Sequence, residues 1–199
     1  MRLPAQFEKK RSDFRELVAL VREDYRAHGS DWTLPGFRAV AVYRFGVWTK
    51  TFGRPRLVHV LISAIYRFLH RYVRNHYTIE LPATATVGRR LVIAHQGGIV
   101  IHHYARIGDD CLIHQNVTLG AATIETVDRG PALGNRVEIG CGAAIIGGVA
   151  IGNDVRIGPN AVVTMNVAEG STVAAPAPRV FRLHRREPTS DVVGVAVGT

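Results

Sequence analysis

The sequence predicts a mainly β protein, a left-handed parallel β-helix preceded by a small α-helical region. Aliphatic residues recur every six positions between 133 and 163, glycine follows most of them, and a second set of small residues runs four places later. The first set comprises Leu133, Ile139, Ile145, Ile151, Ile157 and Val163. The glycines that follow are Gly134, Gly140, Gly152 and Gly158, and the second set is Val137, Ala143, Val149, Val155 and Ala161. A strict period of six fits neither the 3.6-residue period of a helix nor the two-residue period of a strand.

A short fixed period is typical of a chain that coils and stacks on itself. Three six-residue sides make one triangular turn, so each aliphatic residue lies over its equivalent one turn away and fills the prism. Glycine after the aliphatic residue lets the chain turn the corner, where a positive φ costs little only without a Cβ. A glycine-rich β-sandwich is the alternative fold, but it gives no reason for six repeats in phase.

Residues 1–76 form the predicted α-helical region. Apolar residues at helical spacing predict a first helix that Ser12 or Asp13 can cap and that stops at 28–31. A second helix opens at the Pro-Gly pair at 35–36 and repeats its apolar residues at intervals of three and four.

The third helix, predicted over 57–73, is amphipathic. Its basic residues are Arg67, His70, Arg71 and Arg74. Two interpretations stay open: the helix packs on its neighbours or on another subunit with solvated arginines, or it makes a weak peripheral contact with a membrane. Charge reversal of the arginines in a vesicle-binding test would distinguish them.

The coil is predicted over 77–175, and its repeats shift by two positions between Ile99 and Ile101. The repeats then stop over 121–132, a polar stretch. Such an insertion has to leave the prism as a protruding loop, because the core register resumes after it. Proline-rich sequence cannot continue the ladder, so 176–199 is the predicted C-terminal tail.

Composition and charge narrow the class of partner. The formal charge of +9 is spread along the N-terminal third and the tail, and none of the usual DNA- or RNA-binding motifs is present. We therefore expect no nucleic acid partner; an anionic ligand or membrane suits the charge. Cys111 and Cys141 occupy repeat positions as small residues, which indicates a reducing, cytoplasmic location. The sequence shows no signal-peptide run and no stretch of 18 uncharged apolar residues, so we expect no membrane span.

His95 is the strongest candidate for chemistry, since it lies at a predicted corner in the sequence IAHQGG. Histidine is the usual general base near neutral pH. Glu80 precedes it by fifteen residues, close to a turn of about 18, so we expect the two side chains to meet on adjacent coils. A carboxylate on one ring nitrogen would fix the tautomer of the imidazole. The structural alternative is that His95 is only a polar corner residue.

The remaining histidines of the coil do not form a metal-binding pattern. His102 and His114 are twelve residues apart and so fall on different faces of a three-sided coil. His103 does not complete a metal-ligand pattern with either of them. No Asp, Glu or Cys joins them at a spacing that suits zinc. We therefore expect no metal.

Several longer motifs resemble the hexapeptide-repeat acyltransferases, and within them the serine acetyltransferase family. The resemblance covers about residues 14–183. It includes PGFRAVAVYRFGVW in the helical region, IELPATATVG and IAHQGGIVIHHYARIGDDCLIHQNVTLG at the start of the coil, the DRGP loop, and VEIGCGAAIIGGVAIGNDVRIGPNAVV. Many sugar and nucleotidyl acyltransferases share the hexads, whereas the histidine motif combined with the DRGP loop is more specific.

The resemblance implies direct transfer of acetyl from acetyl-CoA to an acceptor hydroxyl, without an acyl-enzyme. His95 matches the family's general base, and Glu80 stands where the family has a supporting aspartate. The implied acceptor-binding residues are Arg129, which matches a carboxylate-binding arginine, with Asp128, Gly130 and Asp31. The implied donor-binding residues are Gly120, Cys141, Gly142, Ala143, Pro159, Ala161, Arg179 and Arg182. The family forms homotrimers with the site between neighbours, and the N-terminal helices could join two trimers.

Departures from the family pattern leave the acceptor open. Ala94 stands where serine acetyltransferases carry an aspartate for the substrate amine, and Gly130 replaces a second functional histidine. The helical region is also shorter than in the long serine enzymes, and AAPAPR replaces the usual closing motif. The sequence therefore predicts an O-acetyltransferase for L-serine or a related small hydroxyl compound. An enzyme acting on a sugar or polysaccharide precursor and a catalytically weak scaffold are the alternatives.

Overall fold

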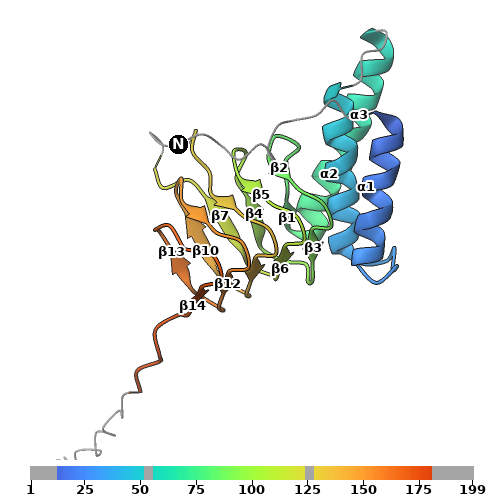
Figure 1. The fold of residues 1–199 in the computed structure, drawn as a ribbon. Helices are drawn as coiled ribbons and strands as arrows, with labels where there is room; N and C mark the ends of the chain where they lie inside the picture. Colours follow the sequence, from blue (N-terminus) through green and yellow to red (C-terminus); the bar gives the residue numbers. More distant parts are fainter. Residues whose placement is uncertain (1–12, 52–55, 124–127, 181–199) are drawn as a thin grey trace, which may run out of the picture.

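The computed structural model describes residues 13–51, 56–123 and 128–180, and it confirms the predicted β-helix with a helical lead-in. The helices are α1 (Phe14–Ala27), α2 (Pro35–Thr51) and α3 (Arg56–Tyr72), followed by a π-helical turn, η2 (Val73–Tyr77). They stand side by side against the end of the coil where its first strands lie (Figure 1). Asp13 caps α1 by accepting a hydrogen bond from the Glu16 backbone N–H (2.7 Å).

Fourteen short parallel strands in the described residues form three sheets, one for each side of the prism. Sheet A contains β1 (Ile79–Glu80), β4 (Ile99–Ile101), β7 (Thr118–Gly120), β10 (Ala144–Ile146) and β13 (Val162–Val163). Sheet B contains β2 (Thr86–Val87), β5 (Arg106–Ile107), β8 (Ala132–Leu133) and β11 (Ala150–Ile151). Sheet C contains β3 (Val92–Ile93), β6 (Leu112–Ile113), β9 (Glu138–Ile139), β12 (Arg156–Ile157) and β14 (Thr172–Val173).

The first turn of the coil is longer than a regular one. Where the coil is regular, one turn carries the chain from Ala144 to its partner Val162, as three six-residue sides predict. In the first turn the chain runs from Ile79 to its partner Ile99, which is two residues more. The strand register places these extra residues in the corner before β4: five residues separate Ile93 from Ile99, whereas three separate the equivalent residues Ile113 and Val117 one turn later. The predicted shift in the repeats is therefore a longer corner at 94–98, which contains His95, rather than a break in the coil.

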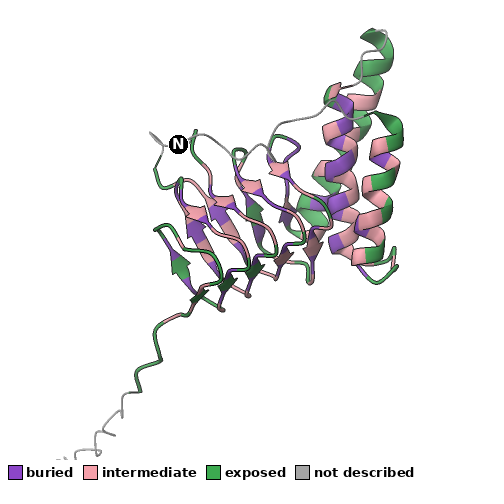
Figure 2. Ribbon diagram, viewed as in Figure 1, coloured by how far each residue is buried: buried purple, intermediate pink, exposed green. Residues whose placement is uncertain are grey.

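Stacked aliphatic side chains fill the prism, and Figure 2 shows the buried residues along its inner wall. The largest fully buried side chains of the coil are Ile79, Leu91, Ile93, Ile99, Ile107, Ile113, Leu119, Leu133, Ile139 and Ile145. Burying one such side chain contributes roughly 1.5–3 kcal/mol relative to leaving it exposed. The residues that give the sequence its period of six are thus the residues that stabilise the coil.

A ladder of side-chain caps runs along the edge between sheets B and C. The carboxylate of Asp109 accepts from the Arg89 N–H (2.7 Å), and the amide oxygen of Asn135 accepts from the Asp109 N–H (2.8 Å). The amide oxygen of Asn153 accepts from the Asn135 N–H (2.9 Å) in the same way. Each corner thus uses a short polar side chain to satisfy the backbone of the turn before it.

Side chains from the helices close the first open end of the coil. The Tyr43 hydroxyl donates to the Ala85 carbonyl oxygen (3.0 Å) and accepts from the Val87 N–H (3.0 Å). The Arg44 guanidinium donates to the Val87 and Gly88 carbonyl oxygens (3.0 and 2.5 Å) and pairs with the fully buried Asp24 (2.8 Å). Backbone groups that a free sheet edge would leave unpaired are therefore satisfied.

His28 completes this closure at the next strand. Its Nε2 accepts from the Ile93 N–H (3.2 Å), and its Nδ1 contacts the Asp24 carbonyl oxygen (2.7 Å). In α2, a Cβ added to Gly36 would collide with the Ile93 carbonyl group, so only glycine permits this approach of helix to strand. Among the described helices, none combines the length and apolar character needed to cross a bilayer.

Candidate active site

His95 lies in the corner 94–98, which joins β3 of sheet C to β4 of sheet A. Its side chain is exposed, and Gly97 and Gly98 adopt φ values of 112° and 63°. The Gly98 N–H donates to the Thr78 hydroxyl oxygen (3.0 Å), and the Asn116 N–H donates to the Gly97 carbonyl oxygen (2.8 Å). Two glycines with positive φ thus form a corner that holds the imidazole on the surface, fixed from both sides.

His114 is the nearest ring to His95 that the structure shows, with 6.0 Å between the ring centroids. The sequence indicated His114 only as a candidate metal ligand, and its proximity to His95 was not predicted. The separation of the two histidines in the sequence is close to one turn of the coil, and this spacing is the signal that could have found the pair. The neighbouring Gln115 has a buried Oε1 that accepts no hydrogen bond from the described residues.

Glu80 lies in β1 and pairs with Val100 of β4, five residues after His95. His95 lies in the corner that leads from β3 into β4. The described electrostatic neighbour of Glu80 is His70 of α3, and no hydrogen bond or ion pair joins the Glu80 and His95 side chains. Burial and the nearby Arg74 lower the pKa of His70, whereas the Glu80 carboxylate opposes that shift.

The corners between sheets C and A form a continuous column that we call the His95 edge: 94–98, 114–117, 140–143 and 158–161. The two corners farthest from the helices contain the predicted donor-binding residues Cys141 to Ala143, Pro159 and Ala161. Backbone hydrogen bonds connect successive corners: the Gly142 N–H donates to the Gln115 carbonyl oxygen (3.0 Å) and the Asn160 N–H donates to the Cys141 carbonyl oxygen (2.9 Å). The predicted base and most of the predicted donor-binding residues therefore lie along one edge of the prism.

The corner at Gly142 of the His95 edge is tightly packed against the next corner. Gly142 has a φ of 72°, and a Cβ there would collide with the Asn160 side chain. Glycine is therefore required at this corner for the packing of one turn on the next, and the Oε1 of Gln115 on the same edge is buried.

The other predicted donor-binding residues lie apart from these corners. Gly120 ends β7 and pairs with Ile146 of β10 on sheet A. Arg179 is exposed in the segment after β14. Arg182 lies outside the described residues.

The predicted acceptor-binding loop lies on a different edge. The corners between sheets A and B form the loop edge: 81–85, 102–105, the described parts of the insertion at 121–123 and 128–131, and 147–149. Asp128 and Arg129 are exposed there, and the Arg129 side chain lies over Gly148. Sheet A separates this edge from the His95 edge, so one chain does not bring Arg129 and His95 together.

The structure explains why glycine occupies position 130. A Cβ at this position would lie 2.6 Å from the Ala105 nitrogen and 2.7 Å from the Tyr104 carbonyl carbon. A histidine, as in the family pattern, would therefore require the loop to move away from the wall.

Asp31 is engaged in the loop between α1 and α2. Its carboxylate accepts from the Thr33 N–H (2.7 Å) and the Thr33 hydroxyl (2.6 Å), and these bonds lower its pKa. Beside it, the Arg38 guanidinium stacks on the exposed Trp32 ring and donates to the Tyr77 hydroxyl (2.9 Å). Tyr77 immediately precedes Thr78, which holds the His95 corner, so this loop lies on the approach to that corner.

The histidines of the loop edge make their own contacts. His103 and the Thr84 hydroxyl are 2.8 Å apart, and burial lowers the pKa of His102. In the described parts of the chain, no group of three or more His, Cys, Asp or Glu residues is arranged to hold a metal ion.

Comparison with known proteins identifies similar chains. Residues 130–164 match the family described as bacterial transferase hexapeptide (six repeats). A serine acetyltransferase of Synechococcus elongatus is 34% identical over 145 residues, which covers 72% of this chain and 55% of that protein. A serine acetyltransferase of Escherichia coli K12 is 34% identical over 116 residues, covering 58% of this chain and 40% of the relative.

Solved structures show the same likeness. Isoform 3 of the Entamoeba histolytica serine acetyltransferase, in complex with cysteine, superposes with a TM-score of 0.70 at 25% identity, covering 86% of this chain and 63% of that one. The Neisseria gonorrhoeae serine acetyltransferase in complex with serine gives a TM-score of 0.69 at 26% identity, covering 84% and 70%. The chain spans about half the length of the curated relatives it matches. These findings confirm the resemblance that the sequence motifs indicated.

Proposed function

We propose, from the chain's likeness to the serine acetyltransferase-like hexapeptide-repeat acyltransferases, that it is an O-acetyltransferase. Acetyl-CoA is the donor, and L-serine or a related small hydroxyl compound is the acceptor. The observation that carries the proposal is the His95 edge, where an exposed histidine and the corners proposed for the donor lie in one column. The serine bound in the Neisseria relative supports L-serine as the acceptor.

In this mechanism His95 is the general base. A ring nitrogen of His95 accepts the proton of the acceptor hydroxyl while its oxygen attacks the thioester carbonyl carbon. The new C–O bond forms as the C–S bond breaks, and the proton passes from His95 to the leaving sulfur, so that CoA departs as a thiol. Positioning by Glu80 is part of the proposal, although its route to His95 would require a rearrangement or a water, since the two share no direct contact.

The geometry also supports a homotrimer as part of the proposal. His95 and Arg129 lie on opposite edges of sheet A, so a loop edge from a neighbouring copy has to approach the His95 edge to complete an acceptor site. Pairing of two trimers through the helical layer is the further assembly we propose. Light scattering after size exclusion would give the number of chains, and a stable, active monomer would contradict the shared site.

A cytoplasmic location belongs to the proposal as well. Cys111 and Cys141 are both free thiols, which suits a reducing compartment, and acetyl-CoA is the proposed donor. Fractionation of cells that express the chain would check the location.

Thiol release from acetyl-CoA tests the function, with L-serine, other small hydroxyl compounds and a panel of sugars as acceptors. We expect His95→Ala to lower turnover by roughly 10² or more, the scale of losing a general base. His59→Ala removes an exposed histidine of α3 and is the matched control. Turnover of His95→Ala equal to that of the control would remove His95 from the mechanism, and release with sugars alone would replace serine as the acceptor.

Arg129→Ala separates the acceptor from the donor. We expect it to raise the KM for the acceptor more than the KM for acetyl-CoA, because the protruding loop is proposed to bind the acceptor carboxylate. Equal effects on both constants would contradict a role in acceptor binding. Binding of CoA without turnover of any acceptor would favour a scaffold.

A further inference from the structure

The apolar side of α3 faces away from the protein. Its large apolar side chains follow one another at intervals of three and four residues, which places them on one side of the helix. The exposed side chains of this stripe are Leu57 (83% exposed), Leu61 (63%), Ile65 (45%), Phe68 (69%) and Tyr72 (43%). None of the 17 residues of α3 is buried, and Figure 2 shows the helix as exposed or intermediate along its length.

The side of α3 that packs on the protein is the less apolar one. Tyr66 accepts a hydrogen bond from the Ala83 N–H (3.3 Å), and His70 lies close to Glu80 of the coil. An amphipathic helix of a globular protein normally turns its apolar stripe to the core. The reversed orientation leaves the apolar stripe of α3 for a surface outside this chain.

Positive charge flanks the stripe. The arginines are Arg56, Arg67, Arg71 and Arg74, all exposed, and no Asp or Glu occurs between residues 56 and 79. Arg67 and Arg71 lie one helical turn apart, on the side of the stripe next to Phe68. The exposed face of α3 thus combines apolar surface with positive charge and carries no carboxylate that could neutralise it.

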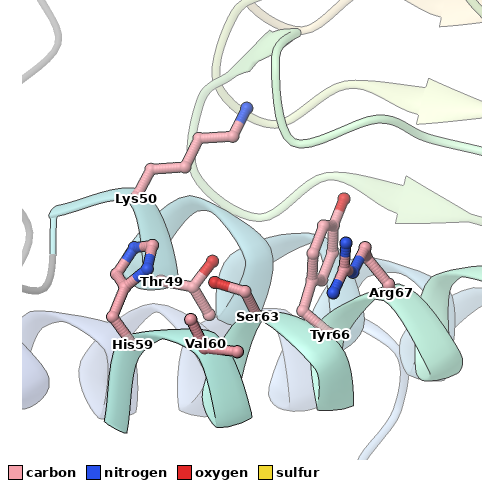
Figure 3. A pocket seen from close by; sticks show the side chains of 7 residues that line it. All are labelled: Thr49, Lys50, His59, Val60, Ser63, Tyr66 and Arg67. Carbon is pink, nitrogen blue, oxygen red and sulfur yellow. The ribbon is translucent and has the colours of Figure 1, made fainter. Parts of the chain in front are cut away.

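A basic pocket of about 310 Å³ adjoins this face, between α2 and α3. Figure 3 shows its side chains projecting from the two helices: Thr49, Lys50, His59, Val60, Ser63, Tyr66 and Arg67. The lining includes the cationic side chains Lys50 and Arg67 and several hydroxyl groups, which are the groups that bind a phosphate. Arg67 belongs both to the pocket and to the arginine flank, so the pocket and the apolar stripe form one continuous surface.

We propose that α3 is a peripheral membrane contact that binds the surface of an anionic phospholipid bilayer. The apolar stripe enters the boundary between headgroups and acyl chains, the arginines pair with lipid phosphates, and the α2–α3 pocket accepts a headgroup. The positive charge of α3 favours an anionic bilayer over a second copy of the chain as the surface that covers the apolar stripe. Stripe-to-stripe packing of two α3 helices would bring arginines together with no carboxylate between them, so the proposed pairing of two trimers uses surfaces of the helical layer other than this stripe. The inference does not depend on acetyl transfer.

Flotation of the full chain with vesicles tests the proposal. We expect binding to vesicles that mix phosphatidylcholine with phosphatidylglycerol, weak binding to pure phosphatidylcholine, and weaker binding at higher salt because of screening. Each arginine near an anionic surface strengthens binding roughly fivefold. The double variant Arg67→Glu/Arg71→Glu should therefore bind at least about 25-fold more weakly. Arg156→Glu, the same change at an exposed position in β12, should bind like the parent chain.

A second variant, Leu61→Ser/Phe68→Ser, removes apolar surface and should also weaken binding. Circular dichroism checks that the variants keep the fold, as expected for exposed positions. Absence of binding to anionic vesicles would overturn the proposal, as would binding that the arginine reversal does not weaken. Loss of subunits from the assembly in the serine variant, when the parent chain does not bind vesicles, would assign the stripe to a second copy of the chain.

Discussion

Replacing Arg44 with methionine is expected to loosen the helical layer from the coil. The Asp24 carboxylate that Arg44 neutralises is fully buried, Arg44 is only 5% exposed, and the nitrogen–oxygen distance is 2.8 Å. Removing one partner of a buried pair costs about 3–5 kcal/mol, because the other charge stays behind without compensation. Two carbonyl oxygens of the coil, at Val87 and Gly88, also lose their donor, at about 1–3 kcal/mol each before any water enters.

A loss of about 5 kcal/mol allows for partial hydration of these groups. In a chain of this size, 1 kcal/mol moves Tm by roughly 2–4 °C, so the expected fall is about 10–20 °C. Thermal unfolding by circular dichroism at one fixed protein concentration measures it, because assembly makes Tm depend on concentration. Arg22→Met, at an exposed position of α1, is the matched control.

The double variant Asp24→Leu/Arg44→Met separates the charge from the packing. Because it leaves no buried charge, it should be less destabilised than Arg44→Met alone, although the two carbonyl oxygens still lack their donor. The reasoning is refuted if Arg44→Met melts within about 3 °C of the Arg22→Met control, a difference that corresponds to only about 1 kcal/mol. It is also refuted if the double variant is no more stable than the single one.

Two further predictions concern the coil. Burial raises the pKa of the Cys111 thiol to about 11, so iodoacetamide at pH 8 should alkylate the half-buried Cys141 faster than Cys111. Peptide mass spectrometry measures the two alkylation rates, and equal rates would contradict the burial of Cys111. Acetyl-CoA should protect Cys141 from alkylation if the donor binds at its corner. The hydrogen bond from Arg90 lowers the pKa of Asp110, so this pair stabilises the fold above pH of about 4 and the contribution disappears as pH falls through the lowered value. Both groups are partly exposed, which limits the contribution of the pair to about 1 kcal/mol or less. Between pH 6 and pH 3 the Tm of Arg90→Met should therefore fall slightly less than the Tm of the parent chain. A steeper fall for Arg90→Met would contradict the conclusion that the pair stabilises the fold at the higher pH.

The β-helix could be predicted from the sequence because its core is a one-dimensional repeat. Each aliphatic residue contacts its equivalent one turn away, so the periodicity of the sequence is also the geometry of the structure. The shift between Ile99 and Ile101 was visible as well, but its meaning was not. Only the strand register shows that the first turn is longer and that its two extra residues lie in the corner 94–98.

The parts that could not be predicted depend on contacts between the helices and the coil. The spacing of Glu80 and His95 suggested that the two side chains meet because it assumed a regular coil. The two extra residues of the first turn change the register, so that Glu80 pairs with Val100, five residues after His95. The amphipathic pattern of α3 predicted a helix correctly. Periodicity shows that a helix has two faces but not which of them meets the protein, so it could not reveal that the apolar stripe faces outward.

The candidate site could likewise be predicted from the sequence only in part. The IAHQGG motif indicated that His95 lies at a corner, and the structure shows it exposed there beside two glycines with positive φ. The roles of His95 and Arg129 remain predictions. Their separation by sheet A could not be read from the sequence, because it depends on which corner of the triangle each residue occupies.

The closed first end of the coil has a consequence for self-assembly. A parallel β-helix is a stack with two ends, and each end presents unpaired backbone groups onto which another coil could add, so that filaments would grow head to tail. Tyr43, Arg44 and His28 already occupy those groups at the end next to the helices. A second molecule that approaches this end meets side chains instead of a free edge. The helical layer therefore stops end-to-end polymerisation of a fold whose repeating geometry would otherwise allow it.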